Sequence, residues 1–377
     1  MNTRLNCSTM SITTRGGARS GTVEFIGWAA PQESSEIVPP QGPIFDADTL
    51  ARTAQVHEAA GFDRVLIGYF TNAPDGFLVG AHVAHSTERL GLLLAHRPGF
   101  VAPTLAARKL ATLDQLTKGR TAVHIISGGS DEDQARDGDF TDHAGRYRRS
   151  AEYVRVLRRT WSERRPFDHR GEFYRVEGQV ADITPWNGES IPVYGGGGSD
   201  AAIEALAPEI DTFMLWGEPI ADTIEFSDRV RKVAADAGNE IGFSVSTRPI
   251  LGRTEGEAWD RAHRYLETIV TRTGRNVLPG GTNVGSQRLL DVAARSEVFD
   301  RCLYTPLAAA TGARGNSTAL VGTPETVAEA LADYVDAGAD ALLIRGYEPL
   351  RDAAEYGEEL IPRTRALVAE RAKATAH

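Results

Sequence analysis

Residues 323–346, TPETVAEALADYVDAGADALLIRG, contain a helix pattern followed directly by a strand pattern. Thr323 and Pro324 are a typical N-cap and first helical residue, and Gly338 follows the last residue of the apolar helix face, where helices often end. The apolar residues of 340–346 then run on without polar alternation, which is typical of a parallel strand covered on both faces. This stretch therefore predicts one helix–strand unit of an α/β protein.

The same kind of unit recurs along nearly the whole chain. We expect eight strands, at residues 23–28, 64–68, 90–96, 121–127, 192–196, 211–217, 241–250 and 340–346, with helix patterns between them. Eight parallel strands that alternate with helices close a TIM barrel, so we predict an α/β fold with one (β/α)8 barrel over residues 22–370. An open, doubly wound sheet is the alternative that the pattern leaves open.

Three segments are longer than a minimal barrel needs. We expect an acidic loop at residues 129–143, a small β excursion at 165–190, and a mobile lid with paired glycines at 272–300. Because the loops that follow barrel strands build the active site, we place these insertions at the C-terminal face. Residues 1–21 have no apolar signal-peptide segment, and we expect a flexible tail there.

Charge and cysteine content exclude several classes of function. The 377-residue chain has a formal net charge of −10, which argues against nucleic acid and anionic membranes as partners. No stretch approaches the roughly 18 apolar residues of a membrane span. The two cysteines, Cys7 and Cys302, are too few for a disulfide framework, so we expect a cytoplasmic protein. An anionic ligand would need a locally basic pocket.

Four consecutive glycines precede Ser199 in IPVYGGGGSDAAIEALA, residues 191–207. They are compatible with a simple turn, with a backbone cradle for a phosphate, or with a dinucleotide fingerprint in which Glu218 would bind the ribose. A second turn of this kind, Gly128-Gly129, follows the fourth expected strand. On a barrel, the two turns would converge on one phosphate.

The residues give no support to a metal site or a nucleophilic hydrolase. A metal hydrolase on this fold usually carries an H-x-H pair on the first strand, and residues 23–28 contain none. His82 and His85 share one helix face, but no third ligand stands at a suggestive spacing. The G-x-S-x-G motif is also absent. We therefore expect no metal.

Four further segments carry a resemblance to a known family: residues 96–120 (HRPGFVAPTLAARKLATLDQLTKGR), 141–153 (TDHAGRYRRSAEY), 215–219 (LWGEP) and 318–331 (TALVGTPETVAEAL). In this order, and together with the strands, they make residues 23–365 similar to the bacterial-luciferase-like flavin monooxygenases. The chain resembles the alkanesulfonate monooxygenase branch most.

The resemblance implies a TIM barrel that binds FMN, as FMNH2, at its C-terminal mouth and uses it to activate O2. It also implies an organosulfonate substrate, a separate NAD(P)H:flavin reductase as FMNH2 donor, and a homodimer or homotetramer. Alternatives are an F420-dependent oxidoreductase on the same barrel, a monooxygenase of a sulfone, ketone or amine, and a flavin-binding protein without turnover.

The resemblance also assigns residues to roles. Tyr147, Gly198 and Ser199 match the positions that hold the FMN phosphate, with Gly128 contributing, and His124 replaces the usual asparagine beside the isoalloxazine. Catalytic positions of the family match Trp216, Arg314 and Tyr347. The chain departs from the sulfonate branch on the seventh strand, where an arginine and a histidine are replaced by Ser246 and Arg248, and at Ala73, where that branch has a cysteine. We therefore expect a more polar sulfonate as the substrate, and we expect Arg248 to bind an anion, either this substrate or the flavin peroxide.

Overall fold

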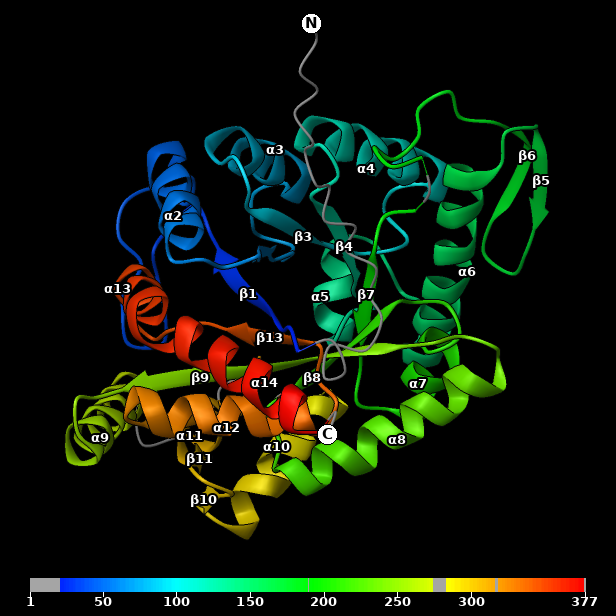
Figure 1. Cartoon of the computed structure of the whole chain (residues 1–377). Coiled ribbons are helices and arrows are strands. Elements are labelled where there is room, and N and C mark those ends of the chain that lie inside the picture. The colour runs from blue at the N-terminus through cyan, green and yellow to red at the C-terminus, as the bar shows by residue number, and fades with distance from the viewer. Residues whose placement is uncertain (1–20, 189, 274–282, 316–317, 376–377) are drawn as a thin grey trace, which may run out of the picture.

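The computed structural model describes residues 21–188, 190–273, 283–315 and 318–375 (Figure 1). Most of the expected tail, residues 1–20, lies outside the described residues, and so do residues 274–282 of the expected lid. The predictions of a flexible tail and a mobile lid remain predictions.

Eight parallel strands form a closed barrel, in the order β1, β2, β3, β4, β7, β8, β9, β13 and back to β1. Each coincides with one of the eight expected strands: β1 (Glu24–Ala29), β2 (Arg64–Ile67), β3 (Gly91–His96), β4 (Thr121–Ile125), β7 (Val193–Gly196), β8 (Thr212–Trp216), β9 (Gly242–Leu251) and β13 (Ala341–Ile344). The predicted TIM barrel is confirmed, and the open-sheet alternative is wrong because β8 pairs with β9 and closes the ring.

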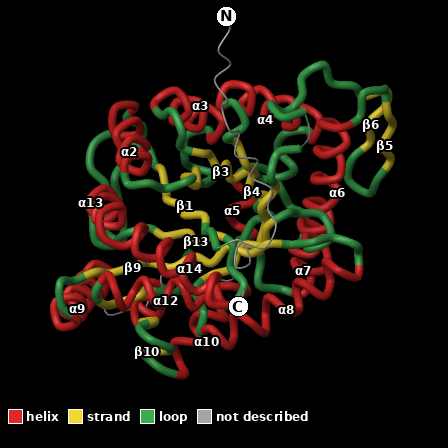
Figure 2. Tube along the Cα trace, in the orientation of Figure 1, coloured by secondary structure: helices red, strands yellow, loops and turns green. Residues whose placement is uncertain are grey.

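Helices surround the strands on the outside of the barrel (Figure 2). They are α2 (Ala47–Ala59), α3 (Gly76–Ser86), α4 (Pro103–Thr117), α6 (His143–Ser162), α7 (Asp200–Leu206), α8 (Ile220–Asp236), α9 (Glu255–Thr273), α12 (Pro324–Asp336), α13 (Pro349–Glu355), the π-helical turn η1 (Tyr356–Leu360) and α14 (Ile361–Thr375). Helix α12 begins and ends as the sequence predicts, because Thr323 caps the Thr326 amide and Gly338 takes φ +103°. Among the described helices, none is long and apolar enough to cross a membrane.

The barrel interior is apolar in its middle and polar at the N-terminal end of the strands. Ile26, Leu66 and Leu343 belong to the apolar cluster inside the ring. Below them, Arg64 Nε lies 2.5 Å from Glu24 Oε1, and Tyr194 Oη donates to Glu24 Oε2 over 2.8 Å. A functional cavity is therefore to be sought at the opposite end, where the strands finish.

The three insertions differ in how well they match the sequence prediction. The β excursion is present as the hairpin of β5 (Phe167–Arg170) and β6 (Arg175–Gln179). It stands between α6 and β7 and so precedes a barrel strand, which means that it is not one of the strand-following loops expected at the C-terminal face. The acidic loop is partly wrong: Ser130 accepts a hydrogen bond from the Asp133 amide and starts α5 (Asp131–Arg136). Acidic side chains in the first turn favour such a short helix.

The third insertion contains α10 (Val284–Arg295), which is followed by short elements that the sequence did not predict. These are β10 (Val298–Phe299), β11 (Leu303–Tyr304), α11 (Pro306–Thr311) and β12 (Ala319–Gly322). Strand β12 runs parallel to the outer half of β9, with Ala319 opposite Arg248. Strand β9 thus extends beyond the ring and carries a small side sheet.

Candidate active site

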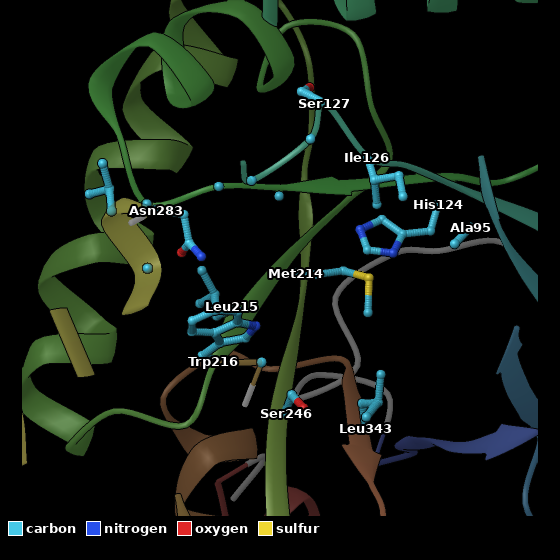
Figure 3. A pocket seen from close by; sticks show the side chains of 18 of the residues that line it. Ala95, His124, Ile126, Ser127, Met214, Leu215, Trp216, Ser246, Asn283 and Leu343 are labelled. Carbon is cyan, nitrogen blue, oxygen red and sulfur yellow. The ribbon is translucent and has the colours of Figure 1, made fainter. Parts of the chain in front are cut away.

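A cavity of about 430 Å³ opens at the carboxyl ends of the barrel strands. In Figure 3, His124, Met214 and Leu343 lie on its right side, and Asn283 and Trp216 on its left. Its wall is mostly apolar and includes Trp28, Leu66, Phe70, Ala95, Ile126, Met214, Leu215, Trp216, Val284 and Leu343. A concave, largely apolar site with a few polar groups is typical of cofactor and substrate binding.

Both glycine turns of the sequence line this cavity. Gly128 takes φ +89°, and a Cβ atom there would lie 1.7 Å from Gln134 Nε2. A Cβ atom on Gly197 would lie 2.3 Å from the hydroxyl oxygen of Tyr147. Side chains are thus excluded at both turns, and the backbone itself forms the wall.

The N-terminus of α10 meets the two turns at the same end of the cavity. A Cβ atom on Gly198 would lie 3.0 Å from the Gly285 amide nitrogen, and one on Gly129 would lie 3.6 Å from Asn283 Cβ. Asn283 Oδ1 accepts from the Ser286 amide over 2.9 Å and caps the helix. Exposed amides at a helix N-terminus attract anions, so this end suits a phosphate.

Arg288 adds a cation to this end of the cavity and is already paired. Its Nε donates to Glu218 Oε1 over 2.8 Å, its Nη2 forms a second contact to the same carboxylate, and the guanidinium lies 4.7 Å from the Phe226 ring centroid. Hydrogen bonding to Glu218 raises the pKa of Arg288. Glu218 therefore has a partner in the protein, which weakens the dinucleotide alternative that assigned it to a ribose.

Tyr147 and His124 are uncharged at neutral pH. Burial raises the pKa of Tyr147 to about 12, so its hydroxyl remains a donor beside Gly197. Burial lowers the pKa of His124 to about 4, and its Nδ1 has no hydrogen-bond partner among the described residues. The imidazole points into the cavity close to Met214 (Figure 3). It is thus available to a ligand as a neutral hydrogen-bonding group.

Residues 23–341 match the family described as luciferase-like monooxygenase. The chain belongs to this family. It is therefore an oxidoreductase of the luciferase-like monooxygenases.

Solved structures share the fold of this luciferase-like chain at low sequence identity. Riboflavin lyase, solved with modified FMN and the substrate riboflavin, is 19% identical with a TM-score of 0.74, over 92% of this chain and 92% of that one. EDTA monooxygenase from Chelativorans sp. BNC1 is 19% identical with a TM-score of 0.70, over 93% and 94%. An F420-dependent secondary alcohol dehydrogenase is 14% identical with a TM-score of 0.65, over 91% and 99%.

Six of the predicted site residues of this luciferase-like monooxygenase line the cavity: His124, Gly128, Tyr147, Gly198, Ser199 and Trp216. Five of them were predicted for cofactor binding, and Trp216 for catalysis. These six residues therefore share one cavity, and their individual roles remain predictions.

The other three predicted catalytic residues lie outside the described lining of this cavity. Arg248 is two residues past Ser246 on β9, where the strand has left the ring, and it faces a neighbouring cavity. Tyr347 is fully buried against Arg248 and Tyr265. Arg314 is exposed in the turn between α11 and β12, whereas its neighbour Gly315 lines the cavity. Their catalytic roles in this luciferase-like chain remain predictions.

Sequence reasoning missed several lining residues, among them Asn283 and Arg288. Asn283 had a readable signal, since it precedes the helical pattern of 284–295 as a good N-cap. Arg288 had no such signal in the sequence, because only the fold brings α10 next to the end of β8.

The candidate metal pair is not supported: His82 Nε2 lies 2.9 Å from the Ala47 carbonyl oxygen, and no metal-binding cluster of three ligands occurs within the described parts of the chain.

Proposed function

We propose that this protein is an FMNH2- and O2-dependent monooxygenase that receives reduced flavin from a separate NAD(P)H:flavin reductase. The observation that carries the proposal is the convergence of two glycine turns and the α10 N-terminus at one end of an apolar cavity. Gly128, Gly198, Ser199 and Tyr147 would hold the phosphate. His124 would meet the edge of the ring system.

The bound cofactor would supply the electrons that activate O2, and the protein would supply orientation and a dry site. Trp216, Met214 and Leu343 keep the middle of the cavity apolar. Tyr147 can donate to a phosphate oxygen because its hydroxyl stays protonated. His124 can bind a ring heteroatom without adding a charge to the apolar wall.

For the substrate we propose an organosulfonate that is cleaved to an aldehyde and sulfite. One oxygen atom of O2 enters the aldehyde and the other leaves as water, while FMNH2 supplies two electrons and is released as FMN. The resemblance to the alkanesulfonate branch and the buried cation of Arg248 support this choice. We further propose that the enzyme acts as a homodimer or homotetramer.

The test has two stages. Quenching of cofactor fluorescence by the purified protein distinguishes FMN from F420. FMNH2 is then supplied by a flavin reductase, and sulfite and aldehyde are assayed over sulfonates from methanesulfonate to polar examples. We expect FMN binding and sulfite release. Tight binding of F420 instead of FMN contradicts the cofactor proposal, and oxygenation of a sulfone, ketone or amine without sulfite contradicts the substrate proposal. If the protein binds FMN but forms no product with any compound of the panel, the alternative of a flavin-binding protein without turnover is favoured.

A further inference from the structure

A second cavity, of about 350 Å³, lies next to the first and shares Trp28 and Arg345 with it. It is bounded by the segment between β1 and α2, through Ser34, Ser35 and Glu36, and by the outer part of β9, through Arg248. Trp28 and Arg345 therefore form the boundary between the two cavities.

Arg248 supplies a deeply buried cation to this second cavity. Its side chain is 1% exposed, its Nη2 donates to the Gly346 carbonyl over 2.9 Å, and its guanidinium carbon lies 3.6 Å from the Tyr347 ring centroid. Its Nε has no hydrogen-bond partner among the residues that the structure describes. A buried guanidinium with an unsatisfied N–H is costly unless an acceptor binds to it.

Glu36 is the carboxylate that faces this cation. Its Oε2 lies 2.7 Å from Arg248 Nη1, and its Oε1 accepts from Arg345 Nη2 over 3.3 Å. Burial alone would raise the pKa of Glu36, but the two arginines lower it to about 2. Burial and the neighbouring Arg248 lower the pKa of Arg345 to about 10, so Arg345 is still charged at neutral pH.

The cavity therefore carries two positive charges and one negative charge. Its histidine, His57, is neutral because burial lowers its pKa to about 4. The backbone around Glu36 is anchored on both sides: Ser35 Oγ donates to the Tyr347 carbonyl over 2.5 Å, and Arg272 Nη1 donates to the Glu36 carbonyl over 2.8 Å. Glu36 is thus a fixed part of the wall. Its charge and those of the two arginines give the cavity lining a net charge of +1.

We propose that the second cavity binds the anionic group of the substrate, and that Glu36 restricts this group to a single negative charge. The inference rests on the proposed function, since the reacting end of the substrate would lie beside the cofactor in the first cavity. One net positive charge is neutralised by a sulfonate or carboxylate monoanion. A dianion would gain twice the attraction to this net charge, but its desolvation cost grows with the square of its charge and is about four times that of a monoanion. Without Glu36 the two arginines would offer twice the net positive charge, which is enough to neutralise a dianion.

The experiment compares two anions of similar shape, ethyl sulfate and ethyl phosphate, at pH 8. Ethyl phosphate is then mostly a dianion, since the second pKa of a phosphate monoester is about 6. Binding to the full-length protein is measured by calorimetry. Wild type should bind ethyl sulfate more tightly than ethyl phosphate. Glu36→Gln should tighten ethyl sulfate about 10-fold and ethyl phosphate about 100-fold, because the repulsion that it removes scales with ligand charge.

Two further variants separate this effect from general charge and from folding. Glu33→Gln removes the same charge from the same segment outside the cavity lining, and should change either affinity less than 2-fold. Arg248→Met should weaken ethyl sulfate more than 10-fold while FMN affinity is kept, which reports an intact first cavity. The affinities of ethanesulfonate and propionate, measured in the same way, show whether a sulfonate or a carboxylate fits the site better.

Equal effects of Glu36→Gln on both anions overturn the charge restriction. No binding of ethyl sulfate to wild type, or binding that survives Arg248→Met, overturns the anion site. If the anions bind as expected but FMNH2 gives no product, the proposed function fails and this inference stands. If neutral substrates are oxygenated and no anion binds, this inference fails together with the sulfonate substrate, and the proposed monooxygenase activity stands.

Discussion

Tyr147 and Gly197 show how single residues shape the end of the cavity that we propose for the phosphate. The tyrosine hydroxyl occupies the space that a Cβ atom on Gly197 would need, so the two residues depend on each other. The sequence indicated both, since a glycine turn after a strand and a tyrosine in a family motif are readable locally. Glu36 could not be predicted, because its partners Arg248 and Arg345 are more than 200 residues away in the chain.

Ser199→Asp tests the phosphate position directly. Ser199 lines the cavity and caps α7 by accepting from the Ala202 amide over 3.2 Å, and aspartate caps a helix equally well. The substitution therefore adds a charge without removing the cap. FMN affinity should fall at least 10-fold, since hydrogen bonds to charged groups contribute about 1.5–3 kcal/mol. Riboflavin, which lacks the phosphate, should bind nearly as before. Fluorescence titration with both flavins measures this, and equal losses would refute the assignment.

At the scale of elements, the β/α repeat was predictable and the additions to it were not. Each barrel strand is a continuous apolar run between helix patterns, which gives a strong local signal. Strand β12 and helix α5 are short, and each depends on a neighbour. Strand β12 pairs with the part of β9 beyond the ring, and α5 packs Gln134 beneath Gly128. Only the tertiary structure provides those neighbours.

The contribution of α10 to the phosphate end is tested by Asn283→Ala. The change removes the cap on Ser286 and should cost about 1 kcal/mol of unfolding free energy. Because the helix N-terminus faces Gly129 and Gly198, FMN affinity should fall several-fold while riboflavin affinity changes little. Thr323→Ala is the matched control, since it removes the cap of α12 away from the cavity. A similar loss of FMN affinity in both variants would argue against a local role for α10.

At the scale of the whole molecule, buried neutral histidines link folding to pH. Burial lowers the pKa of His57, His96 and His124 from 6.5 to about 4. Between these values the unfolded chain binds protons that the folded chain does not, so the folded state loses stability as the pH falls. Each such histidine weakens the fold by roughly 1.4 kcal/mol per pH unit in this window. Asp63, Asp114 and Asp352 act in the opposite direction, because burial raises their pKa.

Comparison of variants isolates one of these histidines. His96, whose Nε2 lies 2.7 Å from Tyr153 Oη, is buried, whereas His85 is exposed on α3. Urea unfolding between pH 4.5 and 6.5 gives the free energy of unfolding as a function of pH. The slope of this dependence should be smaller for His96→Gln than for wild type, by an amount that corresponds to about one proton bound on unfolding. His85→Gln, at an exposed position, controls for the loss of a histidine as such. An unchanged slope in His96→Gln would show that this residue is not held neutral by the fold.

Strand β9 has a consequence for how such an enzyme can diversify. Ser246 lines one cavity and Arg248 the other, two residues further along the same strand. If the arginine stood two residues earlier on this strand, the positive charge would line the first cavity instead of the second. The glycine turns and Tyr147 would be unchanged. Substitutions on this one strand can therefore change the charge of either cavity without altering the backbone turns at the other end of the first cavity. The exchange of Ser246 and Arg248 is the natural starting point for anyone who wishes to redirect this enzyme in the laboratory.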